Sequence, residues 1–151
     1  MNLIFFCILL TFNPAETFYC DCEEFIDFDK ASEVFIGIVT KIEYQEGSDE
    51  LRITLKIKET YKQSDLKLEQ NKSFDLISSI TVCGYNWNAA GEYLVFVEKT
   101  NKGKRVVNMC SLTTEIKYQH DDNGNWVGIP TLSEVLKWGI NKEIRKKWEK
   151  D

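Results

Sequence analysis

Residues 51–58 read LRITLKIK, a strict alternation of aliphatic and polar side chains. The aliphatic positions are Leu51, Ile53, Leu55 and Ile57. Successive side chains of a β-strand point to opposite faces, so a period of two residues is typical of a strand that is buried on one face. The stretch therefore predicts a strand with these aliphatic residues directed toward a core.

Four further strands are expected around this one. Upstream, the stretch from Val34 to Tyr44 places Val34, Ile36, Ile38, Ile42 and Tyr44 on one parity. Downstream, a weaker strand starts at Phe74, Leu76 and Ile77 and runs toward Cys83. The continuous apolar run from Tyr93 to Glu98 is typical of a strand buried on both faces, and the stretch from Arg105 to Leu112 is expected to form a hairpin with it.

Turn and helix signals complete the chain. Residues 121–124 form a polar turn cluster, and the sequence from Thr131 to Glu134 has the spacing of a capping box directly after Pro130. Apolar residues then recur at helical spacing as far as Trp148. We expect a mainly β fold, a five-stranded barrel of the oligonucleotide/oligosaccharide-binding (OB) type with a C-terminal helix. A β-sandwich is the structural alternative.

The N-terminus carries an apolar run from Leu3 to Phe12, which is too short to cross a bilayer as a helix. It predicts a secretory signal over residues 1–19 and one domain over 20–151, secreted to the extracellular space, or to the periplasm in a bacterium, with no membrane span after cleavage. The alternatives are a buried strand or an uncleaved anchor. Small residues favour cleavage after Ala15 or Thr17, whereas cleavage after Tyr19 would make Cys20 the first residue.

Cysteines give a second constraint. Of the five in the sequence, Cys7 leaves with the signal, so Cys20, Cys22, Cys83 and Cys110 remain. An even number in an exported chain predicts two disulfides. Cys20 and Cys22 are too close to bridge each other, which leaves two crossed pairings. A tetrathiolate zinc site is the alternative, although such sites usually contain C-x2-C pairs.

Composition excludes several functions. The formal net charge of -5 gives no electrostatic reason to bind nucleic acid or anionic lipid. The single histidine, His120, lies beside the turn cluster and is expected to be a solvated turn residue. No nucleophile, base or phosphate loop can be assembled, so we expect neither an enzyme nor a cofactor.

Two other features have competing interpretations. The acidic group of Glu23, Glu24, Asp27 and Asp29 is interpreted as a solvated face rather than as a calcium loop, because the central glycine is absent. Trp87, in a polar loop, is either an anchor for a partner or a residue folded back on the barrel.

The order of several motifs resembles one known family. These motifs are the C-x-C at 20–22, ASEVFI at 31–36, VCGY at 82–85, EYLVF at 92–96, CSL at 110–112 and TLS at 131–133. Their order and spacing resemble the amino-terminal, netrin-like domain of the tissue inhibitors of metalloproteinases. The resemblance implies an OB-type barrel with Cys20 bonded to Cys83 and Cys22 bonded to Cys110. Lys30 stands where that family has another cysteine, so a third disulfide is not expected.

The resemblance also implies a function and a site. In that family the leading ridge enters the active site of a zinc protease. Cys20 would then chelate the zinc of the target protease through its free amine and carbonyl, provided that it is the first residue. Asp21 would enter the specificity pocket, Cys22 would complete the ridge, and an adjoining strip would be formed by Ile80, Thr81, Val82 and Cys83. The alternative is a non-inhibitory extracellular module that binds another protein.

Overall fold

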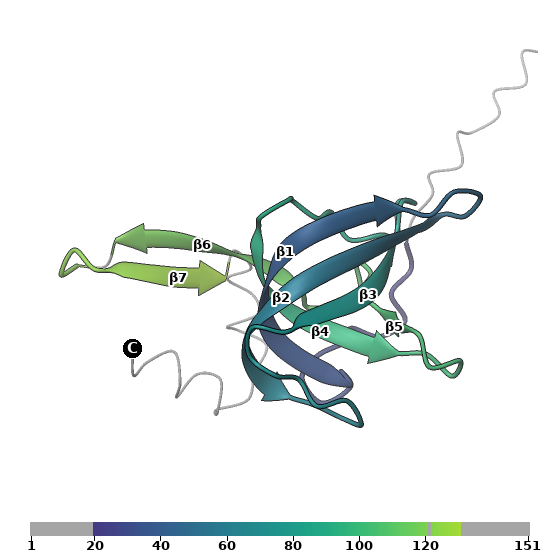
Figure 1. Cartoon of the computed structure of the whole chain (residues 1–151), viewed down its shortest axis with the longest axis horizontal. Helices are drawn as coiled ribbons and strands as arrows, with labels where there is room; N and C mark the ends of the chain where they lie inside the picture. Colours follow the sequence, from purple (N-terminus) through teal and green to yellow (C-terminus); the bar gives the residue numbers. More distant parts are fainter. Residues whose placement is uncertain (1–19, 121, 131–151) are drawn as a thin grey trace, which may run out of the picture.

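A computed structural model describes residues 20–120 and 122–130 (Figure 1). Within these ranges the secondary structure is all β: β1 (Glu33–Tyr44), β2 (Glu50–Lys62), β3 (Ser73–Ser79), β4 (Glu92–Lys99), β5 (Arg105–Val106), β6 (Thr114–His120) and β7 (Trp126–Pro130). No helix that could cross a bilayer is found among the described residues. The predicted signal over 1–19 and the predicted helix after Pro130 lie outside them.

Five of the strands close into a barrel. β1 pairs antiparallel with both β2 and β4, and β2 pairs antiparallel with β3. β5 closes the ring because it pairs parallel with β3 and antiparallel with β4. The prediction of a five-stranded barrel is confirmed, with strands of mixed direction, and the β-sandwich alternative is wrong.

The barrel interior is filled as the alternation in β2 predicts. Ile53, Leu55 and Ile57 are buried there, and Leu51 is partly buried against them. Their neighbours in the interior are Phe35, Val39, Leu68, Phe74, Leu76, Trp87, Tyr93, Val95, Val97 and Val107. Apolar burial of this kind stabilises the domain by roughly 25 cal/mol for each Å² removed from water.

The parity predicted for β1 is wrong. Its pairing with β2 shifts register at three places, so Phe35 and Val39 face the interior, whereas Val34 and Ile36 pack in a second apolar cluster outside the barrel. Beyond Ile38, β1 no longer pairs with β4. Residues 42 and 44 were expected on the same face as Val34, but Ile42 is 37% exposed and Tyr44 is 59% exposed. Bulges interrupt the two-residue period, which explains the error.

Two further expectations are corrected downstream. β5 has two residues, Arg105 and Val106, instead of the longer strand expected as far as Leu112. Residues 122–124 of the turn cluster lie between β6 and β7, two antiparallel strands that were not predicted. β6 pairs with β4 through Tyr93 and Leu94, and the hairpin projects from the barrel (Figure 1).

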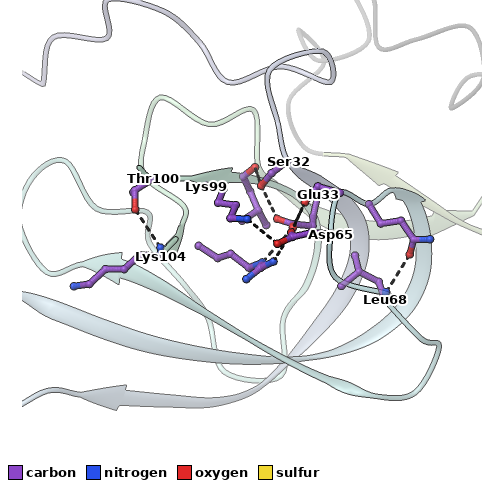
Figure 2. Close-up of polar contacts among 11 residues, drawn as sticks. Ser32, Glu33, Asp65, Leu68, Lys99, Thr100 and Lys104 are labelled. Carbon is purple, nitrogen blue, oxygen red and sulfur yellow. Dashed lines mark hydrogen bonds and ion pairs between the residues drawn. The ribbon is translucent and has the colours of Figure 1, made fainter. Parts of the chain in front are cut away.

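At the end of the barrel where β1 begins and β4 ends, charged side chains meet around Asp65 (Figure 2). Glu33 is fully buried, and its Oε1 accepts hydrogen bonds from Ser64 Oγ at 2.9 Å and from Arg105 Nε at 3.1 Å. Arg105 Nη2 also donates to Asp65 Oδ1 at 3.0 Å, and Lys99 Nζ donates to Asp65 Oδ2 at 2.7 Å. We call the group Glu33, Asp65, Lys99 and Arg105 the ion-paired end.

The ion-paired end fixes the connection between β2 and β3. Asp65 lies in that connection, whereas Glu33 begins β1, Lys99 ends β4 and Arg105 begins β5. The hydrogen bond from Lys99, followed by that from Ser64, holds the pKa of the exposed Asp65 carboxyl far below its usual range. The loop is therefore bound to three strands by side chains distant in sequence.

Candidate functional site

At the opposite end of the barrel, two disulfides attach the leading segment. Cys20 is bonded to Cys83 and Cys22 to Cys110, with Cα atoms 5.4 and 5.5 Å apart. The pairing implied by the family resemblance is thus confirmed, and the tetrathiolate zinc alternative is wrong because all four thiols are used in bridges. Asp21, between the two bridged cysteines, is exposed. We call residues 20–22 the ridge.

The strip beside the ridge is a tight turn that follows β3. Ile80 N donates to Asp49 O at 3.0 Å, which places the strip next to the connection between β1 and β2. Thr81 N donates to Ser79 Oγ at 3.1 Å, and Cys83 N to Thr81 Oγ1 at 3.3 Å. These bonds satisfy the backbone and turn the side chains of Ile80 and Val82 to the surface, where they are 48% and 63% exposed.

Gly84 permits the close approach on which this turn depends. A Cβ atom at that position would overlap the carbonyl oxygen of Ser79. Gly84 N donates to Thr81 O at 2.9 Å, and Gly84 forms an antiparallel bridge with Asn108. A side chain at this position would force the strip, and with it Cys83, to move.

A third segment runs alongside the strip and carries the second bridged cysteine. Met109 N donates to Cys83 O at 3.1 Å, and Cys110 N donates to the side chain of Asn108 at 2.9 Å. The chain that leaves the ridge joins the same segment, because Ile26 N donates to Cys110 O at 2.9 Å. The ridge, the strip and residues 108–111 are therefore connected by backbone bonds as well as by disulfides.

Exposed apolar side chains gather near these bridges. Phe25 is 51% exposed and Met109 is 46% exposed, in addition to Ile80 and Val82. The sequence prediction included Ile80 and Val82 but missed Phe25 and Met109. The signal that could have found them is their position, since each lies close in sequence to a bridged cysteine. Each of these residues lies in a segment that a disulfide or a backbone hydrogen bond ties to the bridged cysteines, and exposed apolar side chains on such fixed segments are suited to binding another protein.

Trp87 is folded back on the barrel and is not an exposed anchor. It is 8% exposed, and its ring lies 4.9 Å from those of both Tyr85 and Tyr93. Asn88 N donates to the Tyr93 hydroxyl at 2.8 Å, which fixes the loop. Burial raises the pKa of Tyr85 and of Tyr93 above that of an exposed tyrosine. This aromatic group stabilises the loop behind the strip.

Other polar candidates have structural roles. Asp27 Oδ1 accepts hydrogen bonds from the backbone nitrogens of Asp29 and Lys30, both at 3.1 Å, so Asp27 caps a turn. His120 is exposed, with its Nδ1 2.9 Å from Gly124 O in the projecting hairpin. Across residues 20–120 and 122–130, no three side chains of His, Cys, Asp or Glu gather in a way that could hold a metal ion.

Comparison with known families gives a match to the barrel. The model of the UNC-6/NTR/C345C module family matches residues 29–125, which include all five strands of the barrel and the strip with its cysteine. No curated protein matches the chain.

Proposed function

Because the chain belongs to the UNC-6/NTR/C345C module family, the netrin-like family that includes the amino-terminal domains of tissue inhibitors of metalloproteinases, we propose that it is a secreted inhibitor of a zinc metalloprotease. The observation that carries the proposal is the ridge, held by disulfides at both of its cysteines beside exposed Ile80 and Val82. The family is one of inhibitory and binding modules, and we propose no catalytic reaction for this chain.

In the proposed mechanism the ridge enters the cleft of the protease. The free amine and the carbonyl of Cys20 bind the catalytic zinc of the target, and this inhibits the protease. Inhibition of this kind needs a rigid ridge, because a chain already held in its bound shape loses little conformational entropy on binding. The two bridges supply that rigidity, and the exposed apolar residues add contact area around the zinc.

Asp21 narrows the choice of target. Its carboxylate would enter the specificity pocket, and burial of a charge without a partner costs several kcal/mol. A protease with a purely apolar pocket would therefore be a poor partner. The proposed target is one whose pocket supplies a Lys, an Arg or several hydrogen-bond donors.

Secretion is part of the same proposal. Disulfides form and persist in oxidising compartments, so the two bridges support export. We propose residues 1–19 as the signal and 20–151 as the mature domain. The alternative function, a non-inhibitory extracellular binding module, is favoured by one observation. Ala15 and Thr17 are the small residues that signal cleavage prefers, and cleavage after either leaves residues ahead of Cys20.

The test begins with amino-terminal sequencing of the protein secreted by a eukaryotic host. Inhibition of a panel of zinc endopeptidases with apolar and with cationic pockets is then measured. The control variant carries one extra alanine before Cys20, which converts the amine into an amide without touching the barrel. We expect a start at Cys20, inhibition of a cationic-pocket protease, and no inhibition by the extended variant. A mature start at Glu16 or Phe18 together with no inhibition would refute the mechanism and favour the alternative.

A further inference from the structure

The sequence contains one site with the pattern for attachment of an N-linked glycan, Asn71-Lys72-Ser73. The pattern is asparagine, any residue except proline, then serine or threonine, and no other asparagine in the chain meets it. We propose that Asn71 carries an N-linked oligosaccharide in the secreted protein. This inference rests on the secretion stated in the proposed function but not on protease inhibition.

The backbone around Asn71 forms a compact turn. Asn71 N donates to Ile57 O at 2.7 Å, Ile57 N donates to Lys72 O at 2.9 Å, and Lys72 N donates to Glu69 O at 3.1 Å. The φ angle of Asn71 is 64°, in the left-handed region where asparagine is one of the residues most often found. The turn is held entirely by the main chain, and so its shape does not depend on the asparagine side chain.

Both side chains of the pattern are available for modification. Asn71, Lys72 and Ser73 are all exposed. Within the described residues, neither the Asn71 amide nor the Ser73 hydroxyl makes a hydrogen bond to another side chain or to the backbone. Asn108 offers a contrast, because its side chain accepts the hydrogen bond of Cys110 N beside a disulfide. A glycan on Asn71 would disturb no contact of the fold.

The proposed reaction is a group transfer from a lipid-pyrophosphate-linked oligosaccharide. The amide nitrogen of Asn71 attacks C1 of the first sugar and forms the N–C1 bond. The bond between C1 and the phosphate oxygen breaks, and the lipid pyrophosphate leaves with its electron pair. The amide nitrogen gives up one proton to the transferase, and no oxidant or reductant is needed.

The glycan would stand at the ion-paired end and away from the ridge. Ser73 begins β3, and Ser79 ends it just before the strip. A strand of that length spans roughly 20 Å at about 3.3 Å per residue. The sugar would therefore cover the connection between β2 and β3 and leave Val82 and the ridge open, so that a protein partner meets the ridge end of the barrel.

The experiment uses the full chain translated in the presence of endoplasmic reticulum microsomes, followed by protease protection and intact mass. We expect a protected chain with one added oligosaccharide that peptide N-glycosidase removes. Asn71→Gln and Ser73→Ala should each abolish the added mass, whereas Ser73→Thr should keep it. Asn101→Gln, at an exposed turn without the pattern, is the matched control and should also keep it.

Two results would overturn the inference in different ways. A protected chain with unmodified Asn71 would show that the protein is exported without the glycan. An unprotected chain would refute secretion, and the glycan with it. A glycosylated protein that inhibits no protease would leave this inference standing and refute the inhibitory function alone, so the two proposals fail separately.

Discussion

The two ends of the barrel are held together in different ways. At the ridge end, two disulfides fix an exposed segment, and apolar side chains such as Val82 remain in water. At the ion-paired end, hydrogen bonds join a fully buried Glu33 to Arg105, and no covalent link is present. The difference shows that disulfides can fix a segment while its side chains stay exposed. A binding surface needs both properties, whereas a stabilising cluster can be buried.

Removal of a disulfide at the ridge end should cause the largest loss in the free energy of unfolding. The double variant Cys22→Ala with Cys110→Ala opens a loop whose ends are 88 positions apart in sequence. The double variant Cys20→Ala with Cys83→Ala opens one whose ends are 63 positions apart. Each should lower the free energy of unfolding by about 4 kcal/mol in the chain-entropy model. Urea unfolding measures the loss. A loss below about 1 kcal/mol would show that the ridge is held mainly by its backbone bonds.

Disruption of the ion pair between Glu33 and Arg105 should cause the next largest loss in the free energy of unfolding. Arg105→Met leaves Glu33 buried without its cation, which should cost about 3 kcal/mol. The double variant Glu33→Leu with Arg105→Met removes both charges and should recover much of that loss, because a buried pair is often no more stable than apolar residues of similar size. Urea unfolding of both variants checks this. If single and double variants lose the same stability, the pair is not the cause.

Gly84→Ala should have a smaller, more local effect. The added methyl meets the carbonyl oxygen of Ser79, so the strip must move, at a cost of about 2 kcal/mol. The same change at Gly103, where a Cβ would meet nothing within 4 Å but φ is +77°, separates overlap from backbone strain. Thermal unfolding gives both losses. We expect inhibition to weaken with Gly84→Ala only.

Val82→Ser should have the smallest effect on folding. Val82 is 63% exposed, so the free energy of unfolding should change by no more than about 0.5 kcal/mol. Its inhibition of a zinc protease should nevertheless weaken, because apolar contact area is lost. Leu66→Ser, 42% exposed in the connection at the ion-paired end, is the control and should change neither quantity. An unchanged inhibition constant for Val82→Ser would place the contact surface elsewhere.

These contrasts also show which parts of the molecule are predictable from sequence. The two-residue period of β2 is a local signal, and it identified Ile53, Leu55 and Ile57 as interior residues. The positions of β1 to β4 and the five-stranded barrel followed from such local patterns, whereas β6 and β7 did not, and the cysteine pairing followed from the family resemblance. Bulges in β1 break the period, and therefore the inward face of that strand could not be read from alternation.

Polar contacts between residues distant in sequence could not be predicted for a different reason. Glu33 and Arg105 are separated by 72 positions, and nothing local in either segment indicates that they meet. Trp87 presented the same problem, since a polar loop gives no sign of whether its tryptophan faces solvent or Tyr93. Phe25 and Met109 lie close in sequence to bridged cysteines, which is a local signal, but their exposure is known only from the structure.

The separation of the bridged cysteines also determines when the ridge can take shape. Cys20 and Cys22 emerge early during synthesis, but their partners follow 63 and 88 positions later. Before the barrel forms, the thiol of either early cysteine can react with Cys83 or with Cys110. Closure of the barrel brings the correct pairs of sulfur atoms within bonding distance. Residues 20–22 are therefore made before the rest of the barrel but fixed last, and closure of both bridges reports that the barrel has folded.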